Sequence, residues 1–155
     1  MNLKVYKIRS HAKLPVRVYR TDAGMDLFYC PNGEKKLYDC TQDFFIPPRE
    51  SRLLPTGIKV EVPYGYMLEI KNKSGIALKR QLIVGACVVD CGYDGEVYVN
   101  LHNIGTQTQM IKAGDKIAQA VLVSIIHCGV EETFEDTLNK NAGRGTGGFG
   151  STGDK

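Results

Sequence analysis

Two carboxylates occupy positions where they could take part in catalysis. Asp90 follows a short apolar run and stands just before a turn, and Asp26 lies between apolar residues in segment 23–27. The alternatives are an Asp that only forms the turn and one satisfied by loop amides. The chemical interpretation is that Asp90 acts as a general base on a water molecule, with Tyr93 packed against the ligand. Asp26 would hold a hydrated Mg²⁺, an ion that keeps most of its waters.

A second group of side chains suits phosphate. Lys73, Ser74 and Gly75 offer in succession a cation, a hydroxyl and a glycine amide at the start of a short expected helix. That combination binds phosphate oxygens. Gln119 interrupts an apolar run, and a buried Gln needs hydrogen-bond partners. It therefore either ties a polar network together or contacts a ligand.

Residues 139–155 contain six glycines and two apolar side chains, Ala142 and Phe149. Such a stretch buries too little apolar surface to offset the entropy of ordering it, so we expect a flexible tail. Its glycine spacing matches a dinucleotide-binding loop, but the flanking strand and helix are not expected, and the P-loop lysine is missing. A disordered linker is the alternative. Arg144, which suits phosphate, and Phe149, on which a base can stack, favour a lid over a nucleotide.

The elements that position these residues have the two-residue period of β-strands. Strand-like patterns occur at 3–8, 52–54, 58–62, 67–70, 97–102 and 117–126. Turn signals separate them, including Asp94-Gly95, which we expect to form a hairpin turn. Helix signals are confined to 74–81, with Ser74 as the expected cap. Many short strands and one short helix predict an all-β fold, a sandwich or barrel.

Composition limits the classes of function. The chain has 155 residues, of which 43% are hydrophobic and 24% charged, so we expect one globular domain with a hydrophobic core. The net charge of +3, without a dense basic run, suits a polyanionic small molecule and predicts no direct nucleic-acid binding. Charges interrupt the first nine residues, and no run approaches the ~20 apolar residues of a membrane span. We therefore expect no membrane partner and a cytoplasmic location.

The cysteines and histidines carry weaker signals. Five cysteines without a secretion signal favour reduced thiols. A zinc site formed by Cys30, Cys40, His127 and Cys128 is the alternative, but the chain contains no CxxC pair. We expect His11, His102 and His127 to be ordinary surface or strand residues.

In their order along the chain, these segments resemble the five sequence motifs of the trimeric dUTPase family. The motifs correspond to 23–27, 73–77, 85–95, 114–119 and 144–153. The resemblance covers almost the whole chain, and the third and fifth motifs are the most specific. Lys73 and Lys116 stand where the family usually has Arg, and Cys87 where it usually has Gly. Segment 30–43 is longer than usual, and we expect it to form a surface hairpin around Asn32-Gly33, with a partner-binding role as an option.

The resemblance implies a homotrimer of jelly-roll-like β-subunits. Residues 1–138 would form the β-domain, and 139–155 a flexible lid that completes a neighbouring subunit's site. The implied reaction is Mg²⁺-assisted, in-line hydrolysis of dUTP to dUMP and pyrophosphate. It keeps uracil out of DNA and supplies dUMP for thymidylate synthesis.

The resemblance also implies a role for each site residue. Asp90 orients or deprotonates the water that attacks the α-phosphorus, Tyr93 lies against the deoxyribose, and Asp26 holds Mg²⁺ through water. Catalytic roles fall to Asp90, Gln119 and Ser74. Substrate contacts fall to Lys73, Ser74, Gly75 and Gln119 on the phosphates, to the hairpin with Gly85, Cys87 and Val89 on uracil, and to Arg144, Phe149 and Gly150 in the tail.

Two rival functions share the same fold. A dCTP deaminase, alone or combined with dUTPase activity, would need a site centred on Glu, whereas the pattern of Asp90 and Tyr93 favours attack of water on phosphorus. A regulatory or binding protein that has lost catalysis is the second rival. Release of pyrophosphate from dUTP, and of ammonia from dCTP, separates the three.

Overall fold

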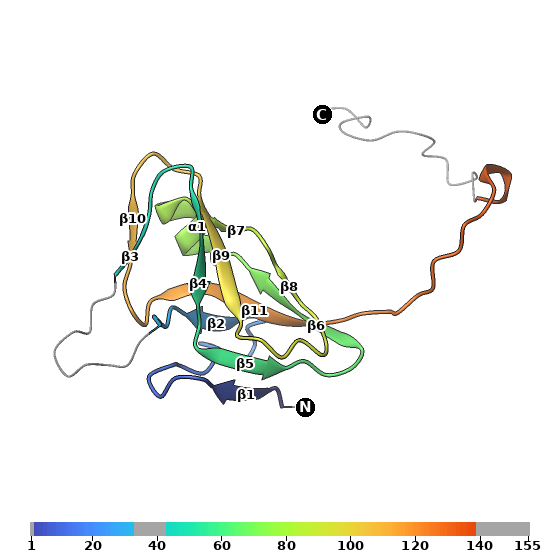
Figure 1. Cartoon of the computed structure of the whole chain (residues 1–155), viewed down its shortest axis with the longest axis horizontal. Coiled ribbons are helices and arrows are strands. Elements are labelled where there is room, and N and C mark those ends of the chain that lie inside the picture. Colours follow the sequence, from blue (N-terminus) through green and yellow to red (C-terminus); the bar gives the residue numbers. More distant parts are fainter. Residues whose placement is uncertain (1, 33–42, 139–155) are drawn as a thin grey trace.

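The computed structural model describes residues 2–32 and 43–138, which are built almost entirely of β-strands (Figure 1). The strands are β1 (Lys4–Lys7), β2 (Met25–Phe28), β3 (Phe44–Ile46), β4 (Ser51–Pro55), β5 (Ile58–Glu61), β6 (Tyr66–Lys71), β7 (Leu82–Val84), β8 (Val88–Val89), β9 (Tyr98–Asn103), β10 (Gln109–Ile111) and β11 (Lys116–Ser124). One α-helix, α1 (Ser74–Arg80), and one short 3-10 helix, η1 (Glu135–Thr137), complete the described elements. The predicted all-β class with one short helix is confirmed.

The strands form four antiparallel groups. The largest sheet has the order β2-β11-β6-β8, and a second has the order β4-β9-β7. The pairs β1-β5 and β3-β10 complete the set. In Figure 1 the pair β1-β5 runs along the lower side of the molecule, and β3 and β10 lie together at its left edge. Non-consecutive neighbours throughout are typical of a sandwich in which strands cross between sheets.

One hydrophobic core collects side chains from strands of every sheet. Its members include Leu27 of β2, Ile46 of β3, Leu54 of β4, Ile58 of β5, Leu68 of β6, Leu82 of β7, Leu101 of β9, Ile111 of β10 and Ile117 of β11. Strand β9 alternates as its sequence predicts, with Val99, Leu101 and Asn103 buried. The buried Asn103 amide is satisfied, because its Nδ2 donates to the carbonyls of Ile46 and Gln107, both at 2.8 Å.

Three local predictions are wrong. Lys73, not Ser74, is the N-cap of α1, and no side chain caps the helix. Neither the Asp94-Gly95 turn nor the segment 85–89 joins a hairpin, because β8 pairs with β6, whereas β7 pairs with β9 and β9 pairs with β4 and β7. Local turn propensity predicts a change of direction, but strand pairing is decided by which faces must be buried against the core.

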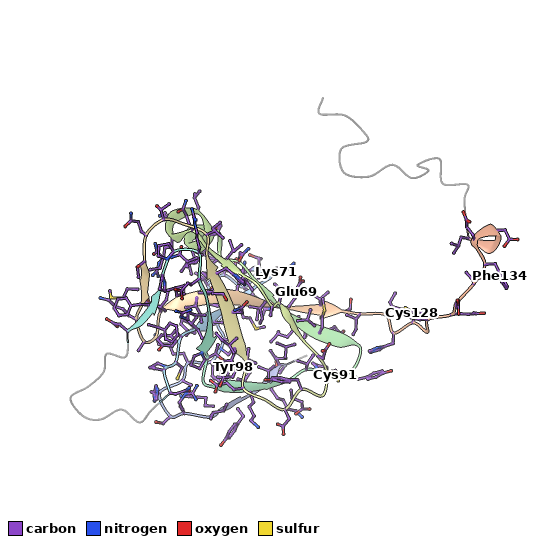
Figure 2. The ribbon with its side chains drawn as sticks, turned by 45° about the horizontal axis from the view of Figure 1, so that its top comes forward. Glu69, Lys71, Cys91, Tyr98, Cys128 and Phe134 are labelled. Atoms are coloured by element: carbon purple, nitrogen blue, oxygen red, sulfur yellow. The ribbon has the colours of Figure 1, made fainter. Side chains whose placement is uncertain are left out.

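Beyond β11, residues 125–138 extend away from the sheets (Figure 1). Figure 2 shows Cys128 and Phe134 on this segment, at a distance from the body of the molecule. Ile126 and Val130 are 93% and 99% exposed. No helix in the described part of the chain is long and apolar enough to cross a membrane. The expected surface hairpin at 30–43 and the expected lid at 139–155 lie largely or wholly outside the described residues.

Candidate active site

Asp26 is the centre of a compact charged cluster. It lies on β2, and only 4% of its surface is exposed. Lys73 Nζ contacts its Oδ1, and Lys116 Nζ lies 2.7 Å from its Oδ2. A buried carboxylate is tolerated only where cations or hydrogen-bond donors compensate its lost hydration. The first, second and fourth motifs of the sequence therefore meet at this point.

The two lysines control the charge of the cluster. Burial by itself would raise the pKa of Asp26, but the Lys116 and Lys73 ammonium groups outweigh it and hold the pKa below its ordinary value of 3.8. Asp26 is thus ionised at neutral pH. The Lys73 and Lys116 side chains are 26% and 45% exposed, so one carboxylate holds two cations at the protein surface. This arrangement suits a bound polyanion.

Asp26 retains an oxygen that fits the expected hydrated Mg²⁺. Its Oδ2 is buried and pairs with the Lys116 ammonium group, but among the described residues no donor makes a hydrogen bond to it, so it can accept one from a metal-bound water. No three His, Cys, Asp or Glu side chains among residues 2–32 and 43–138 gather into a metal site. The zinc alternative places Cys40 outside these ranges, and Cys30, Cys87, Cys91 and Cys128 are free thiols. The contact between Asp26 and Mg²⁺ stays a prediction.

Gln119 lies directly beside this cluster. It is the partner of Asp26 across the β2-β11 pair, and its Nε2 donates to the Asn72 carbonyl at 2.9 Å. A Cβ at position 24 would collide with Gln119 Oε1, so Gly24 of the first motif leaves room for this side chain. The half-buried Gln119 thus has a hydrogen-bond partner within the chain, which is one of the two expected alternatives. Its contact with a ligand stays a prediction.

Asn72 is a residue that the sequence reasoning missed. Its carbonyl receives Gln119, and its Oδ1 accepts the backbone N–H of Val84 at 2.6 Å. It therefore links the charged cluster to β7 and to the loop that joins β7 to β8. The only local signal was an Asn between two lysines at a strand end, which is common in any protein. Ser74 and Gly75 follow on the first turn of α1, where both are exposed.

The loop from β7 to β8, which we call the β7–β8 loop, carries Gly85 and Cys87, and Val89 follows it on β8. The Ile70 N–H donates to the Cys87 carbonyl at 2.7 Å, and Val89 is the partner of Leu68 across the β6-β8 pair. Gly85 is exposed, and Cys87 and Val89 are half-buried. The end of the β7–β8 loop is thus held by backbone hydrogen bonds along one side, which suits a surface that offers its main chain to a ligand.

Asp90 and Tyr93 lie on the turn after β8. The Tyr93 N–H donates to the Asp90 carbonyl at 3.3 Å, and the Tyr93 hydroxyl donates to the Glu96 carbonyl at 3.0 Å. A Cβ at position 95 would collide with the Tyr93 ring, so Gly95 lets the tyrosine fold back over the turn. Asp90 is exposed, and Tyr93 is 48% exposed. Both side chains therefore remain open to water and to a ligand.

A partly buried ion pair anchors the end of this turn. Arg9 and Glu96 form a two-pronged contact, and their side chains are only 16% and 10% exposed. Glu96 Oε1 also accepts the Gly57 N–H at 2.7 Å, and Arg9 donates to the Cys30 carbonyl at 3.3 Å. The sequence reasoning did not find this pair, because its members are 87 residues apart.

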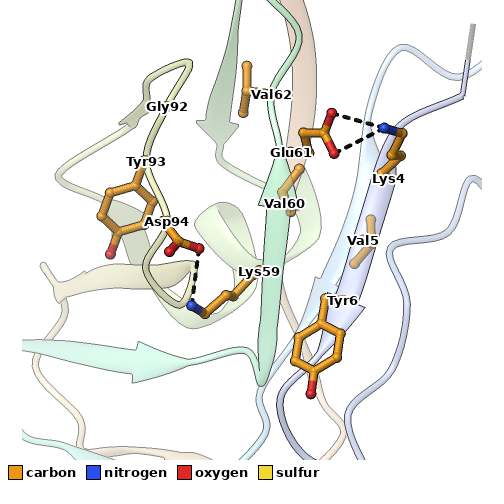
Figure 3. Close-up of a pocket in the computed structure, with 10 residues that line it drawn as sticks. All are labelled: Lys4, Val5, Tyr6, Lys59, Val60, Glu61, Val62, Gly92, Tyr93 and Asp94. Carbon is orange, nitrogen blue, oxygen red and sulfur yellow. Dashed lines mark hydrogen bonds and ion pairs between the residues drawn. The ribbon is translucent and has the colours of Figure 1, made fainter.

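A pocket of about 590 Å³ opens on the other side of the turn (Figure 3). It lies between β1, β5 and residues 92–94, with Tyr93 and Asp94 on the turn that faces β5. Exposed ion pairs join Lys4 to Glu61 and Lys59 to Asp94, at 3.0 and 3.2 Å. Among residues 2–32 and 43–138, Tyr93 is the only predicted site residue that lines it, so we place the candidate site at the Asp26 cluster and the β7–β8 loop instead.

The predicted site residues thus form two groups at opposite edges of one sheet. Asp26 lies on β2 and Val89 on β8, with β11 and β6 between them. Three strand spacings separate these edges, about 14 Å. The structure brings Asp26, Lys73 and Gln119 together and keeps Asp90 and Tyr93 apart from them. Arg144, Phe149 and Gly150 lie outside the described residues.

Comparison with known proteins decides the family. The dUTPase family model matches residues 10–153. The chain belongs to the dUTPase family. A curated family member, the deoxyuridine 5'-triphosphate nucleotidohydrolase of Gloeothece citriformis, is 42% identical over 155 residues, which cover 99% of this chain and 97% of the relative.

Solved structures of this family share the fold. The dUTPase of Staphylococcus bacteriophage 80alpha with dUPNHPP is 25% identical and has a TM-score of 0.80, with 98% of each chain covered. A dUTPase from phage phi11 of S. aureus, described with a structural Mg(II) ion, is 24% identical and has a TM-score of 0.74, covering 87% of this chain and 99% of its own. The jelly-roll β fold expected from the motifs is confirmed.

Proposed function

We propose that this chain hydrolyses dUTP to dUMP and pyrophosphate through attack of water on the α-phosphorus. Membership of the dUTPase family supports the reaction. The observation that carries the assignment is the pair of half-sites on one sheet. One edge offers two lysines held by a buried carboxylate, and the other offers an exposed carboxylate beside a tyrosine and the β7–β8 loop.

The charged cluster would bind the triphosphate. Lys73 and Lys116 both pair with Asp26 and are partly exposed, so their ammonium groups can contact the negatively charged phosphates. Ser74 and Gly75 would add a hydroxyl and an amide, and Gln119 an amide side chain that is already held in place. These groups stabilise charge as it develops on the pyrophosphate leaving group. A lysine at position 73 supplies a point charge instead of the fork of an arginine.

The opposite edge would bind the nucleoside and activate the water. The backbone at Gly85, Cys87 and Val89 would form hydrogen bonds with uracil. Tyr93 would lie against the deoxyribose and leave no room for a 2'-hydroxyl. Asp90, exposed at the end of β8, would accept a proton from the attacking water. A carboxylate open to water and next to the sugar site suits that role.

Mg²⁺ is the cofactor that we propose for this reaction. It would enter with the triphosphate and neutralise part of its charge, because metal-bound phosphates are the usual form in which Mg²⁺ reaches such sites. Asp26 would hold the ion through a metal-bound water that donates to Oδ2, the oxygen without a hydrogen-bond partner among the described residues. Lys73, Lys116 and Gln119 would bind and orient the phosphates.

A homotrimer would bring the two half-sites together. About 14 Å of sheet separates them within one chain. Each chain would therefore place its β8 edge, with the β7–β8 loop, Asp90 and Tyr93, beside the Asp26 cluster of a neighbour. The extended segment 125–138, with Ile126 and Val130 almost fully exposed, supports burial against a second copy. The tail would then deliver Arg144 to the terminal phosphate, Phe149 to the uracil and Gly150 to the phosphate chain.

The test is pyrophosphate release from dUTP with Mg²⁺, with dTTP and UTP as controls and dCTP assayed for ammonia. We expect release from dUTP and little from the controls. Ammonia from dCTP would support the deaminase instead. Binding of dUTP without release of pyrophosphate would support a binding protein that has lost catalysis. The cellular roles, keeping uracil out of DNA and supplying dUMP for thymidylate synthesis, depend on the first result.

A further inference from the structure

The outward face of β9 carries two polar side chains in direct contact. Asn100 and His102 both point away from the core, as the alternation of the strand requires. His102 Nε2 lies 2.9 Å from Asn100 Oδ1. Asn100 Nδ2 donates to the Arg52 carbonyl at 3.4 Å, so Asn100 Oδ1 is the acceptor and His102 Nε2 carries the proton. One end of this network is therefore fixed on β4.

The other end of the network lies under Gly85 and Ala86, the first residues of the β7–β8 loop. The Gly85 N–H donates to the Asn100 carbonyl at 2.9 Å, and the Ala86 N–H approaches Asn100 Oδ1 at 3.4 Å. A Cβ at position 85 would collide with both Asn100 Oδ1 and His102 Nε2. The backbone of Gly85 thus rests directly on this pair of side chains, so a change in either side chain would alter the position of the β7–β8 loop.

We propose that Asn100 and His102 are positioning residues for the nucleobase. They hold Gly85 and Ala86 so that the main chain of the β7–β8 loop keeps the spacing of donors and acceptors that a pyrimidine requires. They act through this loop and do not themselves touch the substrate. The inference rests on the proposed function, in which residues 85–89 bind uracil.

The kinetics of three variants test the proposal. His102→Leu and Asn100→Leu each remove one side of the hydrogen bond, whereas His102→Gln keeps a donor. Since a lost hydrogen bond weakens binding about three- to tenfold, we expect the two leucine variants to raise the KM for dUTP by that factor. The kcat should stay within about twofold, because contacts to the base are made equally in the ground and transition states. His102→Gln should lie nearer the wild type.

Two further measurements separate positioning from simple structural support. The double variant Asn100→Leu/His102→Leu should be no worse than the poorer single variant, because both act through one network. Discrimination between dUTP and dCTP, as the ratio of their kcat/KM values, should fall in the leucine variants. Leu53→Thr is the matched control, since Leu53 lies opposite Asn100 across the β4-β9 pair and is 56% exposed. It should leave KM and discrimination unchanged.

Several results would overturn the inference. One is an unchanged KM in both leucine variants, and another is a lower kcat and unfolding midpoint at constant KM, which would mean structural support alone. A variant whose oligomeric mass in solution differs from that of the wild type would show instead that this face of β9 is a contact between copies of the chain. If the wild type binds dUTP without hydrolysing it, the proposed reaction is wrong. The variants would then be compared by their dissociation constants for dUTP instead of their KM values. A wild type that does not bind dUTP would overturn both proposals.

Discussion

The Asp26 cluster and the turn at 90–96 contain the two carboxylates of the candidate site in opposite environments. Asp26 is buried between two lysines of the same chain, which pair with its two oxygens. Asp90 is exposed at a strand end, and its turn ends at Glu96, which pairs with Arg9. One carboxylate therefore organises cations inside the chain, whereas the other is left open to solvent.

This difference separates binding from chemistry. A carboxylate that organises cations must be ionised and fixed, which burial between two ammonium groups achieves. A carboxylate that accepts a proton from water must instead meet that water, so it must lie at a surface. The two tasks would conflict at one residue, and here they fall to residues at opposite edges of the sheet.

The sharpest test of this difference is Asp90→Asn. We expect turnover to fall about 10²- to 10⁴-fold, the usual contribution of a positioned general base, with dUTP binding and the fold retained. Asp94→Asn is the control on the same turn, because its side chain is 94% exposed and pairs only with Lys59 among the described residues. Pyrophosphate release and binding of a non-hydrolysable analogue measure both. Near-normal turnover in Asp90→Asn would remove the assigned role.

The anchor of the turn is tested by Arg9→Met. Loss of the arginine leaves Glu96, whose side chain is only 10% exposed, without its cation, and we expect the free energy of unfolding to fall by about 2–4 kcal/mol. Lys4→Met removes an exposed partner of Glu61 and should cost less than about 0.5 kcal/mol. Urea unfolding followed by circular dichroism gives both values. Equal costs in the two variants would mean that burial does not distinguish these ion pairs.

The organising role of Asp26 is tested by Asp26→Asn. We expect the free energy of unfolding to fall by about 1–3 kcal/mol, less than for Arg9→Met because both lysines can turn to solvent. Affinity for inorganic pyrophosphate without metal should fall as well, since the two ammonium groups lose their fixed positions. Glu61→Gln serves as the exposed control. Tighter binding of pyrophosphate by Asp26→Asn would show that the carboxylate repels the anion more than it organises the cations.

The pH dependence of stability gives a further test of the ion pairs of Asp26, with a smaller expected change in the free energy of unfolding. The pKa of Asp26 is lowered below 3.8 in the folded chain, so its contribution to stability is present above that pH. It is lost as the pH falls through the lower, folded value. The stability difference between the wild type and Asp26→Asn should therefore be constant from pH 7 to pH 5 and vanish only below pH 3.8. A difference that disappears between pH 5 and pH 7 would contradict the ion-pair explanation.

Local patterns predicted much of this structure, because alternation directly reports which face of a strand is buried. Segments 58–62 and 97–102 became β5 and β9, and the need of Gln119 for partners was visible in its apolar surroundings. The hairpin at Asp94-Gly95 and the cap at Ser74 failed. Both depend on which elements meet in space, which a turn or cap propensity does not contain.

By itself, the sequence determined the strand pattern, the family and the identity of the chemically active side chains, because these follow from residue type and spacing. Only the tertiary structure decided what each of them contacts. The contacts of Asp26 with Lys73 and Lys116, of Arg9 with Glu96, and of Asn100 and His102 with Gly85 join segments that are distant in the chain. Such contacts form because strands must close over one core, and that closure places charged and polar residues from separate strands side by side.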